Sequence, residues 1–165
     1  MTKSLLCILI SALLFAGCST APEPQKTQLQ IREFQTRTFQ VKDQKIVLKA
    51  MLNVLQDDGY IVRNVVSDMG LLSAVKEVDI ESKGEAFAAV FFAGVHARYK
   101  KAQVIEATCN VSEHNDACKV RASFVMKVLD NKGGILDLKQ VDDEKYYQEF
   151  FSKVDKSIFL QKQGL

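Results

Sequence analysis

The first eighteen residues constrain the fold most, because they determine which part of the chain folds and in which compartment. One basic residue, Lys3, precedes an apolar run from Leu5 to Phe15, and the small residues Ala16 and Gly17 follow. This run is too short to span a bilayer as a helix, which takes about 20 residues. Its composition and order are typical of a secretory signal peptide. We therefore predict that residues 1–17 are a signal peptide and that the rest of the chain folds outside the cytoplasm.

The end of this segment, Leu14-Phe15-Ala16-Gly17-Cys18, resembles the lipobox of bacterial lipoproteins, although Phe15 stands where leucine is usual. The resemblance implies cleavage before Cys18, a diacylglycerol on its thiol and an acyl chain on its amino group. Two or three acyl chains anchor a protein stably. Ser19 replaces the aspartate that would resemble an inner-membrane retention signal, so an outer-membrane anchor facing the periplasm is expected. The alternative is an ordinary cysteine after an ordinary signal peptide.

The chain after the signal peptide divides into a polar tether and one domain. Residues 18–30 are polar and contain both prolines of the protein, which is typical of a solvated linker. Residues 31–162 have the length of one domain, and the chain's 47% hydrophobic and 25% charged residues are ordinary for a globular protein. The formal net charge of +2 creates no overall field for nucleic acid, so no nucleic acid is expected as a partner.

Periodicity in residues 31–162 predicts an α+β fold. A helix is expected between Asp43, which can cap its first turn, and Gly59, which can end it. A second helix is expected after residues 142–143, because apolar residues recur there on one helical face: Tyr147, Phe150, Phe151, Val154 and Ile158. The expected strands are 37–41, 60–66, 71–78, 104–112, 117–128 and 135–138. This β-α-β-β…β-β-α order predicts two helices on one face of an antiparallel sheet of about five to six strands.

Two cysteines, Cys109 and Cys118, flank the expected turn at residues 113–116. A hairpin centred on that turn would place them nearly opposite each other, and an oxidising periplasm favours a disulfide between such neighbours. We therefore predict a disulfide between Cys109 and Cys118. Two free thiols are one alternative, and a metal site that adds His114 and Asp116 is another. Because this spacing matches no standard zinc site, no metal is expected.

The most apolar stretch of the mature chain is residues 86–95, and basic residues follow it. Ten residues are too few to cross a bilayer. One interpretation places the stretch in the domain's own core, where apolar residues usually lie. The other exposes it as a contact surface for a partner protein or for the bilayer interface. The contacting side chains would then be Phe87, Val90, Phe91 and Phe92.

Residues suited to catalysis are few. The two histidines, His96 and His114, lie near no recognisable nucleophile motif, and the sequence has no glycine-rich phosphate loop. The acidic pairs at 57–58 and 142–143 occupy predicted helix ends, where capping explains them without chemistry. The sequence therefore predicts no catalytic residue, no cofactor apart from the lipid on Cys18, and no enzyme activity.

Three stretches resemble a widespread family of small bacterial lipoproteins. They are Thr36-Arg37-Thr38-Phe39, Val47-Leu48-Lys49-Ala50-Met51-Leu52-Asn53-Val54-Leu55-Gln56-Asp57-Asp58-Gly59-Tyr60, and residues 147–153 with 157–160. The resemblance covers nearly the whole mature domain and implies a lipoprotein with an α+β domain. The family has no established activity, so the resemblance implies no catalytic residues. The order of elements is also similar to that of small periplasmic modules in outer-membrane assembly and secretion complexes, which is a likeness of fold alone.

These observations lead to an expected role without chemistry. The chain is expected to be a membrane-anchored interaction module of the cell envelope, with other envelope proteins as partners and a secretion or assembly complex as its setting. It would bind through a sheet edge or face and through residues 86–95. The alternative is a periplasmic carrier or sensor of an apolar ligand. A large internal apolar cavity would favour the carrier, whereas a filled core with an exposed patch would favour the module.

Overall fold

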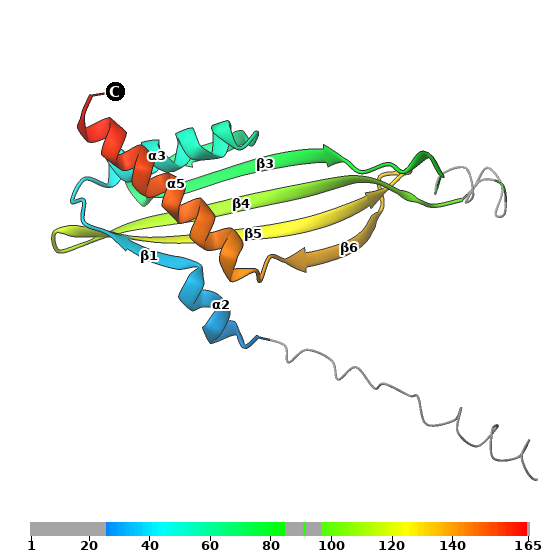
Figure 1. Cartoon of the computed structure of the whole chain (residues 1–165), viewed down its shortest axis with the longest axis horizontal. Coiled ribbons are helices and arrows are strands. Elements are labelled where there is room, and N and C mark those ends of the chain that lie inside the picture. Colours follow the sequence, from blue (N-terminus) through cyan, green and yellow to red (C-terminus); the bar gives the residue numbers. More distant parts are fainter. Residues whose placement is uncertain (1–25, 85–90, 92–96, 165) are drawn as a thin grey trace, which may run out of the picture.

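A computed structural model of the chain describes residues 26–84, 91 and 97–164. The described residues form one α+β domain with a six-stranded antiparallel sheet and three helices, which confirms the predicted fold class (Figure 1). The helices are α2 (Gln28–Phe34), α3 (Gln44–Asp57) and α5 (Glu144–Lys162). The strands are β1 (Thr36–Phe39), β2 (Ile61–Val66), β3 (Leu71–Asp79), β4 (Lys100–His114), β5 (Ala117–Asp130) and β6 (Ile135–Gln140). Within these ranges no helix is both long enough and apolar enough to cross a bilayer.

The centre of the sheet is the long hairpin of β4 and β5. The strand order is β1-β5-β4-β3-β2, and β6 also pairs with β5. Both β1 and β6 therefore lie along the same side of β5, one after the other: β1 pairs with residues 118–121 and β6 with residues 125–129. The β4–β5 hairpin thus carries every other strand directly or through β3.

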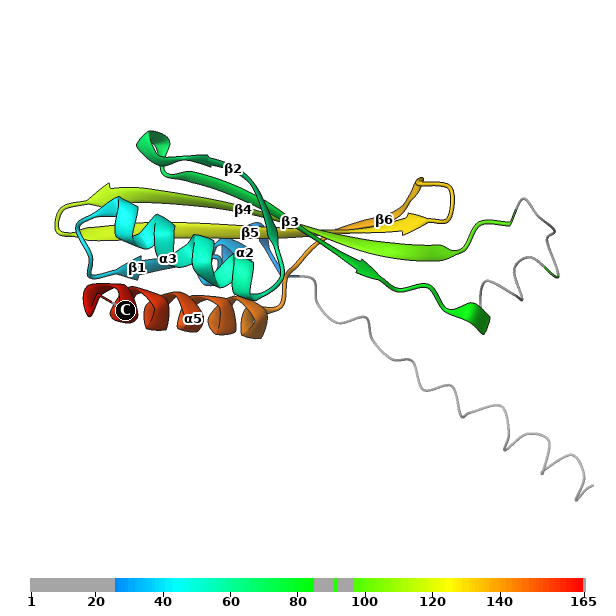
Figure 2. The same cartoon turned by 90° about the horizontal axis from the view of Figure 1, so that it is seen from above.

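The two longer helices, α3 and α5, pack side by side on one face of the sheet (Figure 2). The helix side chains that were predicted to face inward are buried, including Val47 and Met51 of α3 and Tyr147 and Val154 of α5. Alternate residues of β4 and β5 meet them from the sheet, and Phe124 of β5 packs edge-on against the ring of Phe150. Burial of these side chains from water is the main force that holds the helices on the sheet.

The predicted helix caps are confirmed. The carboxylate of Asp43 accepts a hydrogen bond from the N–H of Lys45 at 2.8 Å, and that of Asp143 accepts one from the N–H of Lys145 at 2.9 Å. Each bond satisfies one of the N–H groups that have no partner inside the helix. Gly59, just after α3, has a φ of +83°, a left-handed conformation that favours glycine.

Helix α2 was not predicted, because residues 18–30 were interpreted as tether and the domain was expected to start at residue 31. The helix begins at Gln28, and its first turn is closed by a reciprocal pair. The Thr27 hydroxyl accepts from the N–H of Gln30, and the Gln30 side chain accepts from the N–H of Thr27. This capping box stabilises a short helix within a segment of polar composition. Ile31 is buried, so α2 belongs to the domain.

The hydroxyl of Tyr147 joins three separate parts of the fold. It accepts hydrogen bonds from the Nε2 of Gln35 at 3.1 Å and from the N–H of Phe124 at 3.3 Å, and it donates to the carbonyl of Val141 at 3.0 Å. Gln35 and Tyr147 are both fully buried. One phenol therefore satisfies polar groups from the end of α2, from β5 and from the segment before α5.

We expect Tyr147→Phe to lower the free energy of unfolding by about 1–3 kcal/mol, because it leaves buried polar groups without a partner. Tyr146→Phe is the matched control: it removes a hydroxyl from the neighbouring residue of α5, whose half-buried phenol, among the described residues, bonds to the hydroxyl of Tyr60 alone. Urea unfolding followed by circular dichroism measures both variants. Equal losses for the two variants would contradict the assigned role of Tyr147.

Candidate interaction surface

The sheet extends well beyond the helices that cover it. We call the uncovered part the sheet overhang; it consists of residues 75–79, 100–106, 125–130 and all of β6. Figure 1 shows α3 and α5 over the end of the sheet that carries the β4–β5 turn, with β3, β4 and β5 continuing past them. In the covered half, residues of β4 and β5 alternate between buried and exposed, whereas Asp130 is the one buried residue of the overhang. Both faces of the overhang are therefore open to solvent.

One face of the overhang carries an apolar patch. Residues paired across antiparallel strands share a face, and Cys109, Leu72 and Ala122 are buried under the helices. Their immediate strand neighbours therefore point to the opposite side, which we call the helix-free face. In the overhang this face presents the apolar patch, which surrounds the ion pair of Lys127 and Glu106 and consists of Val104, Val125, Leu129, Ile135 and Leu138. The side chains of Ile135 and Leu138 are 58% and 59% exposed.

The outer edge of the overhang is β6. Among the described strands β6 pairs only with β5, so its other side has backbone groups available for a further strand. One of its N–H groups, that of Leu138, donates to the side chain of Asp137 at 2.9 Å. Asp137 and Lys139 put charges along this edge, which hinders indiscriminate pairing with other strands. The edge thus combines exposed apolar side chains with selective backbone access.

The far end of the overhang is held by Asp130. Its carboxylate accepts hydrogen bonds from the N–H groups of Gly134 at 2.7 Å and Lys132 at 2.9 Å, and it pairs with the guanidinium of Arg98. Burial acts to raise the pKa of Asp130, but these two N–H groups and Arg98 outweigh it and hold the pKa below its usual value. The charged carboxylate therefore links the β5–β6 turn to Arg98, which lies just before β4. This fixed turn keeps β6 in place without helix packing.

Grooves in the described surface are open and polar. Four of them have charged side chains on their walls: Lys26 and Glu144 in the first, Arg32 and Arg121 in the second, Asp57 and Lys156 in the third, and Arg63 and Glu106 in the fourth. None of these four has the enclosed apolar wall that holds a lipid or another apolar ligand.

The described residues hold no constellation suited to metal or acid–base chemistry. No group of three or more His, Cys, Asp or Glu side chains within them is placed to bind a metal ion. The hydroxyls of Tyr60 and Tyr146 lie 2.8 Å apart, but burial raises the pKa of both phenols. They therefore stay protonated at neutral pH and form a structural hydrogen bond.

The predicted disulfide is wrong: Cys109 and Cys118 are free, buried thiols. Asn115 adopts a left-handed φ of 55°, and the chain turns between His114 and Ala117, one residue later than the predicted centre. Cys118 consequently pairs with Glu113, and Cys109 pairs with Ala122. The cysteines share a face but are offset by four residues of strand, about 13 Å, which is too far for a disulfide. The Sγ of Cys118 instead lies 3.6 Å from the carbonyl of Lys42.

Other predicted site residues lie mostly outside the described part. Cys18 and the signal peptide are outside it, as are Phe87, Val90 and Phe92. Phe91 is described, and its side chain is 72% exposed. The apolar patch on the helix-free face was missed: the consecutive residues Ile135-Leu136 beside a glycine pair predicted a strand but gave no signal that it would be exposed.

Comparison with known proteins gives a likeness of structure only. A crystal structure of a DUF4468 family protein from Bacteroides ovatus ATCC 8483 is similar, with a TM-score of 0.39 and 10% sequence identity. The similarity covers 74% of this chain and 84% of that chain. No family model matches the chain, and no curated protein matches it. Any proposal about function therefore rests on the surface of the chain itself.

We expect both thiols to be protected in the folded protein and free after unfolding. Burial raises the pKa of the Cys109 thiol to about 12 and also raises that of Cys118, so neither forms the reactive thiolate near neutral pH. Mass spectrometry after iodoacetamide treatment without reductant should show no alkylation of Cys109 or Cys118 in buffer and alkylation of both in urea. If the thiols stayed unmodified in urea until a reductant was added, the prediction of a disulfide would be right after all.

Proposed function

We propose that this chain is a non-enzymatic, lipid-anchored module of the bacterial cell envelope that binds other envelope proteins through its sheet overhang. The observation that carries the proposal is the apolar patch at an uncovered sheet edge. Ile135, Leu136 and Leu138 are each at least 44% exposed on one short strand. Clustered exposed apolar side chains of this kind usually mark a surface that another protein covers.

Edge pairing and the patch together support one binding mode. A partner segment in extended conformation can add to the free side of β6 through backbone hydrogen bonds. Its alternate side chains would then lie beside the apolar patch on the helix-free face, where Leu138 and Ile135 are exposed. Backbone bonds provide affinity in this mode, and the side-chain contacts provide specificity.

The filled core between helices and sheet favours an interaction module over a carrier of an apolar ligand. The residues that face each other between helix and sheet, such as Met51, Leu55 and Phe124, are at most 1% exposed and belong to one continuous core. The four grooves described above are open and charged. A carrier would need an enclosed apolar space of about 300 Å³ or more.

Anchoring is proposed from the sequence. The lipobox resemblance at Cys18 supplies the lipid, and the stretch from Cys18 to the start of α2 at Gln28 supplies the tether. Ten residues of extended chain reach at most about 33–36 Å. The domain would therefore stay close to the outer membrane while its overhang remains accessible in the periplasm.

Site-specific photocrosslinking in intact cells tests the partner surface. We expect probes at Ile135 and Leu138 to capture the same envelope protein, and a probe at Ser112 not to capture it. Ser112 is the control because it is exposed on the helix-free face of the covered half, away from the overhang. Leu138→Asp should then weaken binding of the purified partner at least about tenfold, which is the scale of losing one buried leucine contact.

The partner proposal fails if the three probes capture the same proteins with the same yield. It also fails if Leu138→Asp and the control Ser112→Asp bind the purified partner equally well. Capture of lipid alone at Ile135 and Leu138 would turn the interpretation of the overhang toward membrane contact.

The anchor has a separate test. Cys18→Ser removes the thiol that would carry the diacylglycerol, and the protein should move from the membrane fraction to the soluble periplasmic fraction. Immunoblots of the two fractions measure this change. Metabolic labelling with an alkyne fatty acid should mark the wild type and leave the variant unmarked. Equal labelling of both proteins would exclude Cys18 as the lipidated residue.

A further inference from the structure

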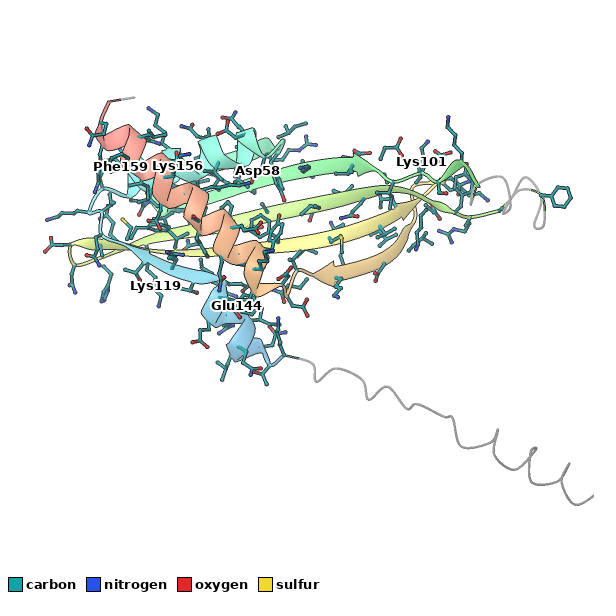
Figure 3. The ribbon with its side chains drawn as sticks, in the orientation of Figure 1. Asp58, Lys101, Lys119, Glu144, Lys156 and Phe159 are labelled. Carbon is teal, nitrogen blue, oxygen red and sulfur yellow. The ribbon has the colours of Figure 1, made fainter. Side chains whose placement is uncertain are left out.

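A basic groove lies at the covered end of the sheet, where α2 borders the helix-free face. It has a volume of about 540 Å³ and is formed by α2 on one side and by β1, β4 and β5 on the other. We call it the basic groove; its lining residues are Arg32, Glu33, Thr36, Asn110, Ser112, Lys119 and Arg121. Figure 3 shows Lys119 near β1, whereas Lys101 lies at the opposite, overhang end of the sheet.

Strand register brings the polar groups of this groove together. Thr36, Arg121 and Asn110 form one row across β1, β5 and β4. The next row is Thr38, Lys119 and Ser112. Both rows point to the helix-free face, since the intervening residue Val120 is fully buried under the helices. Each cation of β5 therefore has hydroxyl or amide groups on both sides of it.

The cations of the groove have no carboxylate partner. Arg37, Lys42, Lys127, Lys145 and Lys153 each form an ion pair elsewhere on the described surface. Within that same surface no ion pair involves any of the three cations that line the groove, Arg32, Lys119 and Arg121. Glu33 is the single acidic residue of the lining, so the groove has a net charge of +2 at neutral pH.

This combination of groups suits a phosphate ligand. Arginine presents a planar set of N–H donors that can bond to two phosphate oxygens at once, and lysine adds a point charge. The side-chain amide of Asn110 can donate to a further oxygen, whereas the hydroxyls of Thr36 and Ser112 already donate to the carbonyls of Arg32 and Lys119. The lining has no aliphatic or aromatic residue, so an apolar ligand would meet only the stems of charged and polar side chains.

The position of the groove indicates where the phosphate comes from. Arg32 belongs to α2, the first helix after the proposed tether, and it is four residues after Gln28, where that helix begins. The tether is at most about 33–36 Å long, so an anchored domain keeps the groove within reach of the bilayer surface. The apolar patch lies farther along β5: Val125 is four residues from Arg121, about 13 Å, and Leu129 is ten residues from Lys119, about 33 Å.

We propose that the basic groove binds phosphate groups of anionic phospholipids in the membrane that carries the anchor. The proposal rests on the proposed lipid anchoring, because the anchor holds the groove at the bilayer surface. Contact between headgroups and the groove restricts how the anchored domain lies on the bilayer. The lipid then does more than retain the protein, since it also limits the orientations of the sheet.

Vesicle co-sedimentation of two charge-matched variants tests the groove. All proteins carry Cys18→Ser, so that no acyl chain contributes and the N-terminal segment is the same. The groove variant is Arg32→Gln, Lys119→Gln and Arg121→Gln. The control variant is Lys45→Gln, Lys49→Gln and Lys156→Gln, which removes the same charge from exposed positions on the helices. Vesicles contain phosphatidylcholine with or without phosphatidylglycerol.

We expect the groove variant to lose roughly 100-fold in partitioning onto phosphatidylglycerol vesicles, at about fivefold for each charge removed near an anionic surface. The control variant should lose less than about fivefold, and no protein should show a difference on phosphatidylcholine alone. Arg32→Gln by itself, which leaves the sheet untouched, should lose about fivefold. This single variant keeps the test valid if the triple variant unfolds at lower urea concentration.

Three results would overturn the proposal. Equal losses in the groove and control variants would assign the binding to overall charge. Unchanged binding of the groove variant would exclude the groove. If the NMR resonances of the groove residues shifted on adding inorganic phosphate while both variants bound vesicles equally, the groove would be assigned to soluble phosphate in place of lipid. The anchor is judged independently, by the release of the Cys18→Ser protein from cell membranes.

Discussion

The pairing of β4 with β5 is the interaction on which the rest of the structure depends. These strands have 15 and 14 residues, and β1, β3 and β6 all pair with one of them. A strand rises about 3.3 Å per residue and a helix only about 1.5 Å, so the hairpin is about 47 Å long while the 19 residues of α5 span about 28 Å. Helices of this size cannot cover such a sheet. The overhang is thus a geometric consequence of strand length.

Local signals in the sequence were sufficient to predict most elements of the covered half. Asp43 and Asp143 mark helix starts by the same capping hydrogen bond, and the apolar spacing from Tyr147 to Ile158 correctly identified the buried side of α5. Both signals act within a few residues, so no knowledge of the tertiary structure is needed to interpret them. Helix α2 was missed for the opposite reason: its capping box, Thr27 with Gln30, lies in a polar segment whose composition suggested a linker.

The disulfide and the apolar patch could not be predicted, because each depends on contacts between distant residues. Whether Cys109 meets Cys118 is decided by the register of the hairpin, and a left-handed Asn115 moves the turn enough to offset them by four residues. Whether Leu138 and Ile135 are buried is decided by what packs above β5, and their local sequence is the same in either case. The run around Ile135 therefore predicted a strand correctly without indicating that it would be exposed.

The helix-free face carries two chemically different surfaces at its two ends. The rows at Thr36 and Thr38 are polar and basic, whereas the rows that end at Leu138 and Ile135 combine apolar side chains with Lys127 and with acidic residues of β3. A single sheet provides both because its strands are long: Lys119 and Leu129 are about 33 Å apart along β5, although Arg121 and Val125 are separated by only four residues. The described chain enters the domain between the two surfaces, because the ammonium of Lys26 donates a hydrogen bond to the carbonyl of Asp142, two residues after β6. The point of entry therefore favours neither surface, and it is the chemistry of the side chains on each that distinguishes them.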